Sequence, residues 1–154
     1  MTKTKPRRFA PYVPISGTPL AILVDLDGTM ALRGDRSPYD ETKVGADLPN
    51  EPVIAVVRAM ERAGHTVIFC SGRTEACRWQ TEMWLSANYA RPYMALHMRA
   101  VGDTRADRVV KAEIFDREIR RRYQVVCVFD DRATVVAMWR SLGLTVMQVA
   151  EGDF

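Results

Sequence analysis

The feature that most constrains the fold of this chain is a regular alternation of short apolar runs with longer amphipathic stretches. Apolar runs occupy residues 20–25, 65–70, 124–129 and 144–149, with a weaker one at 92–97. Helical patterns occupy residues 51–63, 74–87, 107–122 and 132–142. Strands that alternate with helices of this length form βαβ units. We therefore predict an α/β fold, a three-layer Rossmann-like sandwich around a mainly parallel central sheet.

Length and composition fit one domain with a short tail. A chain of 154 residues can bury one core without disulfides or metal clips. We expect residues 19–154 to form this domain and residues 1–18, with Lys3, Lys5, Arg7 and Arg8, to form a flexible N-terminal tail. Residues 30–48 are polar and rich in turn residues, which predicts a small flap over the strand ends rather than a full cap domain.

The sequence also predicts the cellular setting. No run approaches the length that spans a bilayer, and the first residues lack the apolar core of a signal peptide, so we expect no membrane contact. The three cysteines form no CxxC pair, which favours a reduced, cytoplasmic location. A formal charge of +3 is compatible with a polyanionic partner but does not argue for one.

Two acidic motifs follow predicted strands. DLDGT stands at residues 25–29, after the first apolar run, and DD stands at residues 130–131, after the run at 124–129. Ligands of parallel sheets bind at the carboxyl ends of the strands. Carboxylates held close together resist joint ionisation unless a cation is present or one of them acts as an acid. Taken alone, each motif can also be interpreted as an acidic turn.

Two further features suit phosphate. SGR at residues 71–73 follows the 65–70 run and precedes a helical pattern, so its hydroxyl, backbone N–H groups and helix N-terminus predict a phosphate cradle. The alternative is that Ser71 only caps the helix. Lys111 lies four residues after Asp107. That spacing fits a surface ion pair, or a lysine that neutralises a phosphoryl group while Asp107 orients it. Sequence reasoning leaves both pairs of alternatives open.

Taken in order, these motifs resemble the four motifs of the haloacid dehalogenase superfamily of phosphatases. MALRGDRSPYD, CSGR, RAVGDTRADRVVKAEIF and DDRATVVAMWRSLGLTVMQVAEGDF are similar, more narrowly, to the 3′-phosphatase domain of T-even phage polynucleotide kinase-phosphatase. The resemblance covers the chain from residue 20 to its end. The sequence has no GxxxxGK[S/T] phosphate loop, so we expect no 5′-kinase activity in this chain.

The resemblance implies a role for each motif residue. Asp25 is expected to attack phosphorus and form an aspartyl-phosphate, and Asp27 to serve as general acid and then base. Mg²⁺ is the implied cofactor, with ligands from Asp25, Asp27 (through its backbone carbonyl), Asp130 and Asp131. Ser71 and Lys111 are expected to hold the non-bridging oxygens. The implied substrate-binding residues are Thr29, Arg36, Arg73, Asp107 and, as a strand contact, Arg99.

The function implied by the resemblance is a polynucleotide 3′-phosphatase that heals DNA or RNA ends. It would act in a host cytoplasm if the chain is phage-encoded, and the apolar GLTVMQV sequence allows a homodimer. A nucleotidase or other small-molecule phosphatase of the same superfamily is the alternative enzyme. A receiver-like module without catalysis is the alternative binding protein, but receivers do not carry DGT after an aspartate on their first strand.

Overall fold

The computed structural model describes residues 9–153, which fold around a five-stranded parallel sheet of order β5-β4-β1-β6-β7. The strands are β1 (Leu20–Val24), β4 (Thr66–Thr74), β5 (Ala95–Arg99), β6 (Gln124–Asp130) and β7 (Val146–Gln148). Every pairing in this sheet is parallel. Because β4 and β6 flank β1, the carboxyl ends of these three strands meet at one edge of the sheet. The predicted α/β fold is confirmed.

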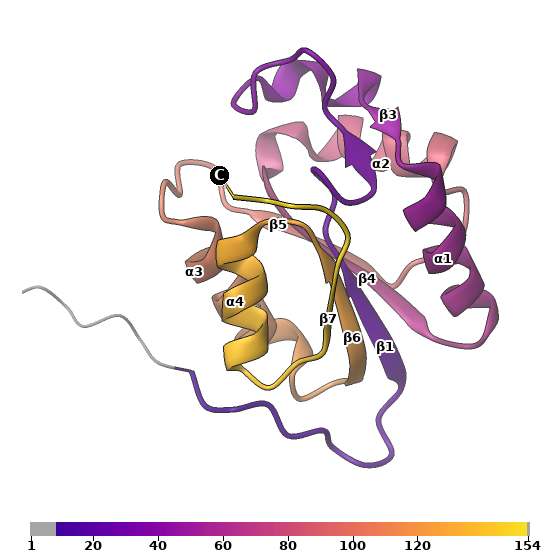
Figure 1. Cartoon of the computed structure of the whole chain (residues 1–154), viewed down its shortest axis with the longest axis vertical. Coiled ribbons are helices and arrows are strands. Elements are labelled where there is room, and N and C mark those ends of the chain that lie inside the picture. Colours follow the sequence, from indigo (N-terminus) through magenta and orange to yellow (C-terminus); the bar gives the residue numbers. More distant parts are fainter. Residues whose placement is uncertain (1–8, 154) are drawn as a thin grey trace, which may run out of the picture.

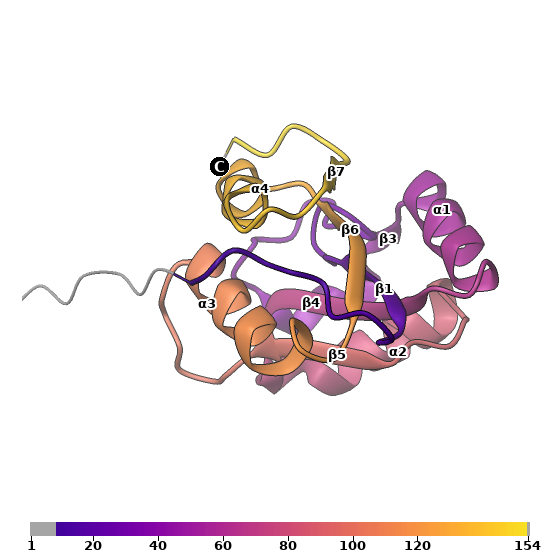
Figure 2. The ribbon, with the colours of Figure 1, turned by 90° about the horizontal axis from the view of Figure 1, so that it is seen from below.

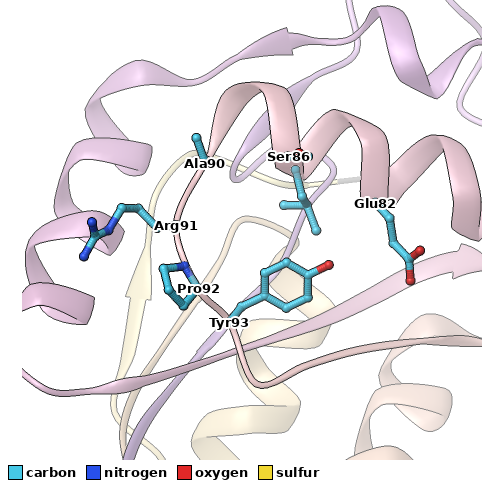
Figure 3. Close-up of a pocket in the computed structure, with 7 residues that line it drawn as sticks. Glu82, Ser86, Ala90, Arg91, Pro92 and Tyr93 are labelled. Carbon is cyan, nitrogen blue, oxygen red and sulfur yellow. The ribbon is translucent and has the colours of Figure 1, made fainter.

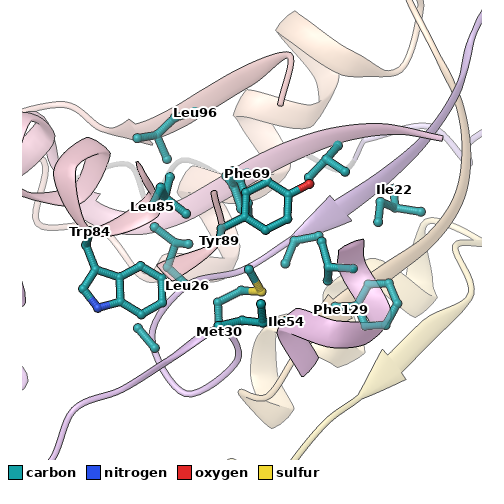
Figure 4. Close-up of a cluster of buried hydrophobic side chains, with 14 of the residues drawn as sticks. Ile22, Leu26, Met30, Ile54, Phe69, Trp84, Leu85, Tyr89, Leu96 and Phe129 are labelled. Carbon is teal, nitrogen blue, oxygen red and sulfur yellow. The ribbon is translucent and has the colours of Figure 1, made fainter. Parts of the chain in front are cut away.

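Helices cover both faces of the sheet (Figures 1 and 2). They are α1 (Glu51–Arg62), α2 (Arg78–Asn88), α3 (Asp107–Ile114) and α4 (Ala133–Ser141). The apolar side chains of α1 and α2 pack with one face, where Phe69 contacts Tyr89 edge to face, 5.4 Å between ring centroids (Figure 4). Those of α3 and α4 pack with the other face, around Phe115 and Trp139. The three layers follow from strands that are apolar on both sides.

The flap predicted at residues 30–48 is an ordered substructure. It contains β2 (Ala31–Leu32), a 3₁₀ turn η1 (Glu41–Ala46) and β3 (Leu48–Pro49), and β2 pairs with β3 in an antiparallel ribbon. Val44 is fully buried, and the indole of Trp84 donates to the Asp47 carbonyl at 2.7 Å. The flap is thus anchored on α2 and lies at the end of the sheet that carries the acidic motifs (Figure 1).

Strand β4 is longer than predicted, and this changes the setting of Ser71, Gly72 and Arg73. The strand continues to Thr74, a 3₁₀ turn η2 (Glu75–Cys77) follows, and α2 begins only at Arg78. The prediction that this triplet sits at a helix N-terminus is therefore wrong. The reason is tertiary, because Thr74 pairs with β5 again after a register shift. The Glu41 carboxylate of the flap also accepts the Thr74 backbone N–H and hydroxyl.

The described part of the predicted tail, residues 9–18, lies against the domain. The Tyr12 hydroxyl donates to the Tyr123 carbonyl at 2.9 Å, and its ring meets Phe115 edge to face. The basic residues Lys3, Lys5, Arg7 and Arg8 lie outside the described residues, so the tail and the boundary at residue 19 stay predictions. Among residues 9–153, none of the helices has the length and apolar character needed to cross a bilayer.

Candidate active site

Three carboxylates gather where β1 and β6 end. Asp25 follows β1, and its backbone N–H donates to the Phe129 carbonyl at 2.9 Å, so the two strands stay paired up to the site. Asp130 ends β6 and Asp131 comes next. One carboxylate oxygen from each of Asp25, Asp130 and Asp131 lies within 4.8 Å of the others, and all three residues are buried. The two acidic motifs of the sequence therefore form one cluster.

Lys111 of α3 enters this cluster from the side. Its Nζ donates to Asp25 Oδ1 at 2.7 Å and to Asp130 Oδ2 at 3.0 Å, and it lies 3.7 Å from Asp107 Oδ2. The side chain is only 1% exposed. Burial by itself would lower the pKa of Lys111, but the carboxylates of Asp25, Asp130 and Asp107 together hold that pKa above its ordinary value. Lys111 is thus a fixed cation inside the site, and the alternative of a surface ion pair is wrong.

The cluster carries more negative than positive charge. Burial raises the pKa of Asp25 well above its usual range, Lys111 opposes this, and the other aspartates add to it. Burial and then Asp130 likewise raise the pKa of Asp131. Four carboxylates, those of Asp25, Asp107, Asp130 and Asp131, face two cations. These are the Lys111 ammonium and the guanidinium of Arg99, which donates to Asp107. Buried carboxylate oxygens with unbalanced charge are the donor set of a hard divalent cation, so these residues fit Mg²⁺.

The backbone around Asp131 is packed too closely for side chains. A Cβ on Gly28, which has φ of 80°, would overlap the Asp131 carboxylate. A Cβ on Gly152 would overlap the Asp131 carbonyl, which also accepts from Gln148 Nε2 at 3.2 Å. The glycine of DLDGT therefore packs against the Asp131 carboxylate, and the C-terminal segment packs against the Asp131 backbone. Thr29 adds a hydroxyl, 3.3 Å from Asp25 Oδ2 and 3.5 Å from Asp131 Oδ1.

A second ionic network surrounds Asp27. Arg73 donates to both carboxylate oxygens of Asp27, from Nε at 3.0 Å and Nη2 at 2.9 Å. Arg36 of the flap donates from Nη2 to Asp27 Oδ1 at 3.0 Å. The Asp27 side chain is 41% exposed, whereas the two arginine side chains are buried. Asp27 thus stands at the solvent-accessible rim of the site, with its carboxylate turned toward the flap.

The same two arginines share another carboxylate, that of Asp47. Arg36 donates to it from Nε at 2.6 Å and Nη2 at 2.7 Å, and Arg73 donates from Nη2 at 2.9 Å. The Asp47 side chain is 1% exposed. Sequence reasoning missed Asp47, because it belongs to no motif and its burial depends on how the flap folds back.

The arginines determine the protonation of Asp27. Burial would raise the pKa of Asp27, but the hydrogen bonds and charge of Arg73, followed by the charge of Arg36, outweigh it and lower that pKa. The carboxylate is therefore ionised in this arrangement.

The remaining predicted residues divide between the two networks and the segment that joins them. Ser71 is fully buried, and its hydroxyl accepts the Arg73 backbone N–H at 3.2 Å. Arg99 donates to Asp107 Oδ1 at 3.3 Å and to the Gly72 carbonyl at 3.0 Å. A Cβ on Gly72 would overlap the Asp107 carboxylate, so this segment and the start of α3 are in direct contact.

A pocket of about 540 Å³ lies elsewhere, between the end of α2 and the loop before β5 (Figure 3). Glu82, Ser86, Arg91 and Tyr93 are among its lining residues. The loop leads into the amino end of β5, whereas Asp25 follows the carboxyl end of β1, and the strands are parallel. This pocket is therefore at the opposite edge of the sheet from the acidic cluster.

Residues 19–154 match the family described as the polynucleotide kinase PNKP phosphatase domain. The chain belongs to this family. It is also 38% identical over 149 residues to a putative bifunctional polynucleotide kinase/RNA ligase of Autographa californica nuclear polyhedrosis virus. That match covers 94% of this chain but only 22% of the viral protein. The family places the chain among HAD phosphatases related to PNKP, as the resemblance implied.

Solved structures agree with this family assignment. One from a Pnkp1/Rnl/Hen1 RNA repair complex has 41% identity and a TM-score of 0.89, covering 93% of this chain and 46% of that one. Another from a Pnkp1/Rnl/Hen1 complex has 38% identity and the same TM-score, covering 100% of this chain and 53% of that one. The class C acid phosphatase from Bacillus anthracis shares the fold, with a TM-score of 0.62, 15% identity and coverage of 90% of this chain and 68% of that one. The chain spans about half or less of the relatives with substantial identity.

Proposed function

We propose that this phosphatase-family chain removes the 3′-phosphate from nucleic-acid ends, and that it prefers RNA ends to DNA ends. The observation that carries the proposal is the position of Asp25, an aspartate held by a buried lysine beside two further aspartates in a PNKP-type phosphatase domain. RNA is favoured over DNA because the viral relative is named for an RNA ligase and one structural relative for an RNA repair complex.

In this proposal Asp25 is the nucleophile. One of its oxygens is occupied by Lys111, and the other faces Thr29 Oγ1 at 3.3 Å. Attack on the phosphorus of a 3′-phosphate forms the aspartyl–phosphate bond and breaks the bond to the terminal 3′-oxygen. The 3′-oxygen takes a proton from Asp27, which has the more exposed carboxylate at the rim. Water then cleaves the acyl phosphate, its proton returns to Asp27, and phosphate leaves.

Two arginines are available to the phosphate. In the structure, Arg36 and Arg73 form ion pairs with the carboxylates of Asp27 and Asp47. A phosphate dianion beside Asp27 competes for the guanidinium groups, and release of Asp27 from them raises its pKa toward that of a proton donor. Binding of the substrate and protonation of the acid are coupled in this way.

Mg²⁺ is the cofactor we propose, held by Asp25, Asp130 and Asp131, with the Asp27 backbone carbonyl as a further ligand. When bound, it would offset the repulsion between the carboxylates and an anionic phosphate. Lys111 supplies a permanent positive charge beside Asp25. Ser71 lies near the same end of the sheet, because the β1–β4 register pairs Val24 with Phe69 and Ser71 follows Phe69 by two residues.

The first experiment measures phosphate release from matched RNA and DNA oligonucleotides that carry either a 3′- or a 5′-phosphate, with a small aryl phosphate alongside. Each assay is run with Mg²⁺ and with a chelator. Asp25→Asn tests the nucleophile, and Asp116→Asn is the matched control, because Asp116 lies on the 115–119 turn and pairs with Arg120. Among the oligonucleotides, metal-dependent release from the 3′ ends and not from the 5′ ends, lost in Asp25→Asn and kept in Asp116→Asn, is the expected result.

Other outcomes separate the alternatives. Release from the aryl phosphate alone would leave the phosphatase chemistry in place and replace the polynucleotide substrate with a small ester. Equal rates on RNA and DNA would remove the preference for RNA. Retained turnover in Asp25→Asn would overturn the mechanism.

The product suggests the partner enzyme. Removal of a 3′-phosphate leaves the 3′-hydroxyl that a ligase joins, so we propose that this chain acts ahead of a nucleic-acid ligase. Two structural relatives come from complexes named for Pnkp1, Rnl and Hen1. A homodimer, the cytoplasmic location and a phage origin stay predictions.

A further inference from the structure

Arg99, the last residue of β5, has its guanidinium committed to the protein. Nε donates to the Gly72 carbonyl at 3.0 Å, and Nη1 donates to the carbonyls of Asp103 at 3.1 Å and Arg105 at 2.6 Å. Nη2 donates to Asp107 Oδ1 at 3.3 Å. The side chain is 12% exposed. Most of its N–H donors are therefore engaged with the protein, which leaves little of the guanidinium for a nucleic-acid strand.

Two of the four acceptors of Arg99, Gly72 and Asp107, belong to the segments that hold Ser71 and Lys111. Gly72 lies between Ser71 and Arg73 in β4. Asp107 begins α3, and its other oxygen is 3.7 Å from the Lys111 ammonium. Arg99 thus connects the Ser71–Arg73 segment of β4 with the first turn of α3 through one planar group.

We propose that Arg99 is a positioning residue that sets the distance between the Ser71–Arg73 segment and helix α3, and through Asp107 holds the Lys111 ammonium against Asp25. The proposal deepens the phosphatase function proposed above and rests on it. It replaces the expectation that Arg99 is a strand contact.

The close approach of β4 to α3 supports this role. A Cβ at Gly72 would overlap the Asp107 carboxylate, so the two segments touch without an intervening side chain. A carboxylate in that position needs a donor that can bind it and the neighbouring carbonyl at once. A guanidinium can do this with its fixed fork, whereas the ammonium of a lysine presents a single point of charge.

Two substrates separate the positioning role from a strand contact. Arg99→Lys keeps the charge and loses the fork, and its kcat and KM are measured on an aryl phosphate and on a 3′-phosphorylated oligonucleotide. We expect kcat to fall about 10- to 100-fold on both substrates, with KM changed less than about 3-fold, because a reacting group displaced by a fraction of an ångström loses rate rather than binding. A rise in KM on the oligonucleotide, with the aryl phosphate unaffected, would make Arg99 a strand contact and overturn the proposal.

Arg117→Lys is the matched control, because Arg117 is 66% exposed and pairs only with Glu118 among the described residues. It should leave kcat and KM unchanged on both substrates. Gly72→Ala perturbs the contact between β4 and Asp107 through β4. Its added methyl group should displace Asp107 and reduce kcat on both substrates.

A double-mutant cycle that combines Arg99→Lys with Asp107→Asn distinguishes a positioning role of Arg99 from a purely stabilising one. If Arg99 acts through Asp107, the double variant should lose no more kcat than the worse single variant. The urea midpoints of the four proteins provide a readout that needs no turnover, and they should also be non-additive. A lowered midpoint with unchanged kcat of the folded fraction would give Arg99 a merely structural role. If the wild type hydrolysed the aryl phosphate but no oligonucleotide, the proposed polynucleotide substrate would be wrong. The kcat values of the wild type and Arg99→Lys on the aryl phosphate would still test the positioning role of Arg99.

Discussion

The two sides of the site combine cationic side chains with carboxylates in different proportions. On the side of α3, two cations, the Lys111 ammonium and the Arg99 guanidinium, face four carboxylates. On the side of the flap, two guanidinium groups, those of Arg36 and Arg73, face the two carboxylates of Asp27 and Asp47. The first arrangement is short of positive charge and the second is balanced.

This difference indicates what each side binds. A buried excess of carboxylates is stable only with an added cation, so the α3 side is suited to a divalent metal. Arginines held by exchangeable carboxylates can transfer their hydrogen bonds to an arriving anion, so the flap side is suited to phosphate. Asp25 and Asp27 stand two residues apart in the chain, yet each belongs to a different side.

The largest effect should come from Asp25→Asn, on the carboxylate-rich side. An amide cannot form the acyl phosphate, so turnover should fall at least about 10³-fold while folding is kept. Phosphate release and the far-ultraviolet circular dichroism spectrum measure the two properties. A loss below about 10-fold would show that Asp25 is not the nucleophile.

Lys111→Met should be the most destabilising change. It leaves the buried carboxylates uncompensated, and we expect a loss of about 3–5 kcal/mol in the free energy of unfolding at pH 7. Without the lysine, the folded-state pKa values of the aspartates rise further above their unfolded values. The variant should therefore lose stability as the pH rises above about 4 and approach the wild type below it. Urea titrations at several pH values test this, and a pH-independent loss would contradict it.

Stabilisation by Mg²⁺ should depend on the carboxylates of the α3 side and not on those of the flap side, and it can be measured without an activity assay. Mg²⁺ at about 100 times its dissociation constant should stabilise the folded protein by about 3 kcal/mol, measured as a rise in the unfolding temperature. Asp131→Asn should remove most of that rise, because it removes a carboxylate of the cluster. Asp47→Asn should keep it, because its network is already balanced. An equal loss in both variants would contradict the comparison.

Asp47→Asn should itself have a moderate effect. The side chain keeps its shape but leaves two buried guanidinium groups with one fewer charged acceptor, and we expect a loss of about 1–3 kcal/mol in the free energy of unfolding. Asp27 is then the one carboxylate that Arg36 and Arg73 bind among the described residues, which lowers the pKa of Asp27 further and should reduce kcat. Urea unfolding and steady-state kinetics measure these changes, and wild-type values in both would show that Asp47 has no role.

The smallest effect should come from outside both networks, at Ala90. This residue follows α2 with φ of 53°, a left-handed conformation that glycine adopts without strain. Ala90→Gly should raise the free energy of unfolding by up to about 1 kcal/mol and leave kinetics and Mg²⁺ binding unchanged. Loss of stability in this variant would mean that the entropy cost of glycine exceeds the relieved strain.

The sequence predicted the elements that rest on local patterns. The apolar runs of β1 and β6 gave the strands close to their observed bounds, and the acidic motifs after them fell at one edge of the sheet. It failed at β4, where pairing with β5 and the flap carboxylate of Glu41 keep residues 71–74 extended. It also left Asp47 unnoticed, and it predicted none of the hydrogen bonds that Arg99 makes within the protein.

What the sequence determined by itself is the periodicity of the chain and the chemistry of its motifs, because each depends on residues that are neighbours along the chain. The tertiary structure alone decided how the charges pair. Lys111 meets Asp25 across 86 positions, and Arg73 meets Asp27 across 46. Such partners are selected by which carboxylate lies nearest after the sheet and the flap have closed, and burial then makes each choice energetically costly to change.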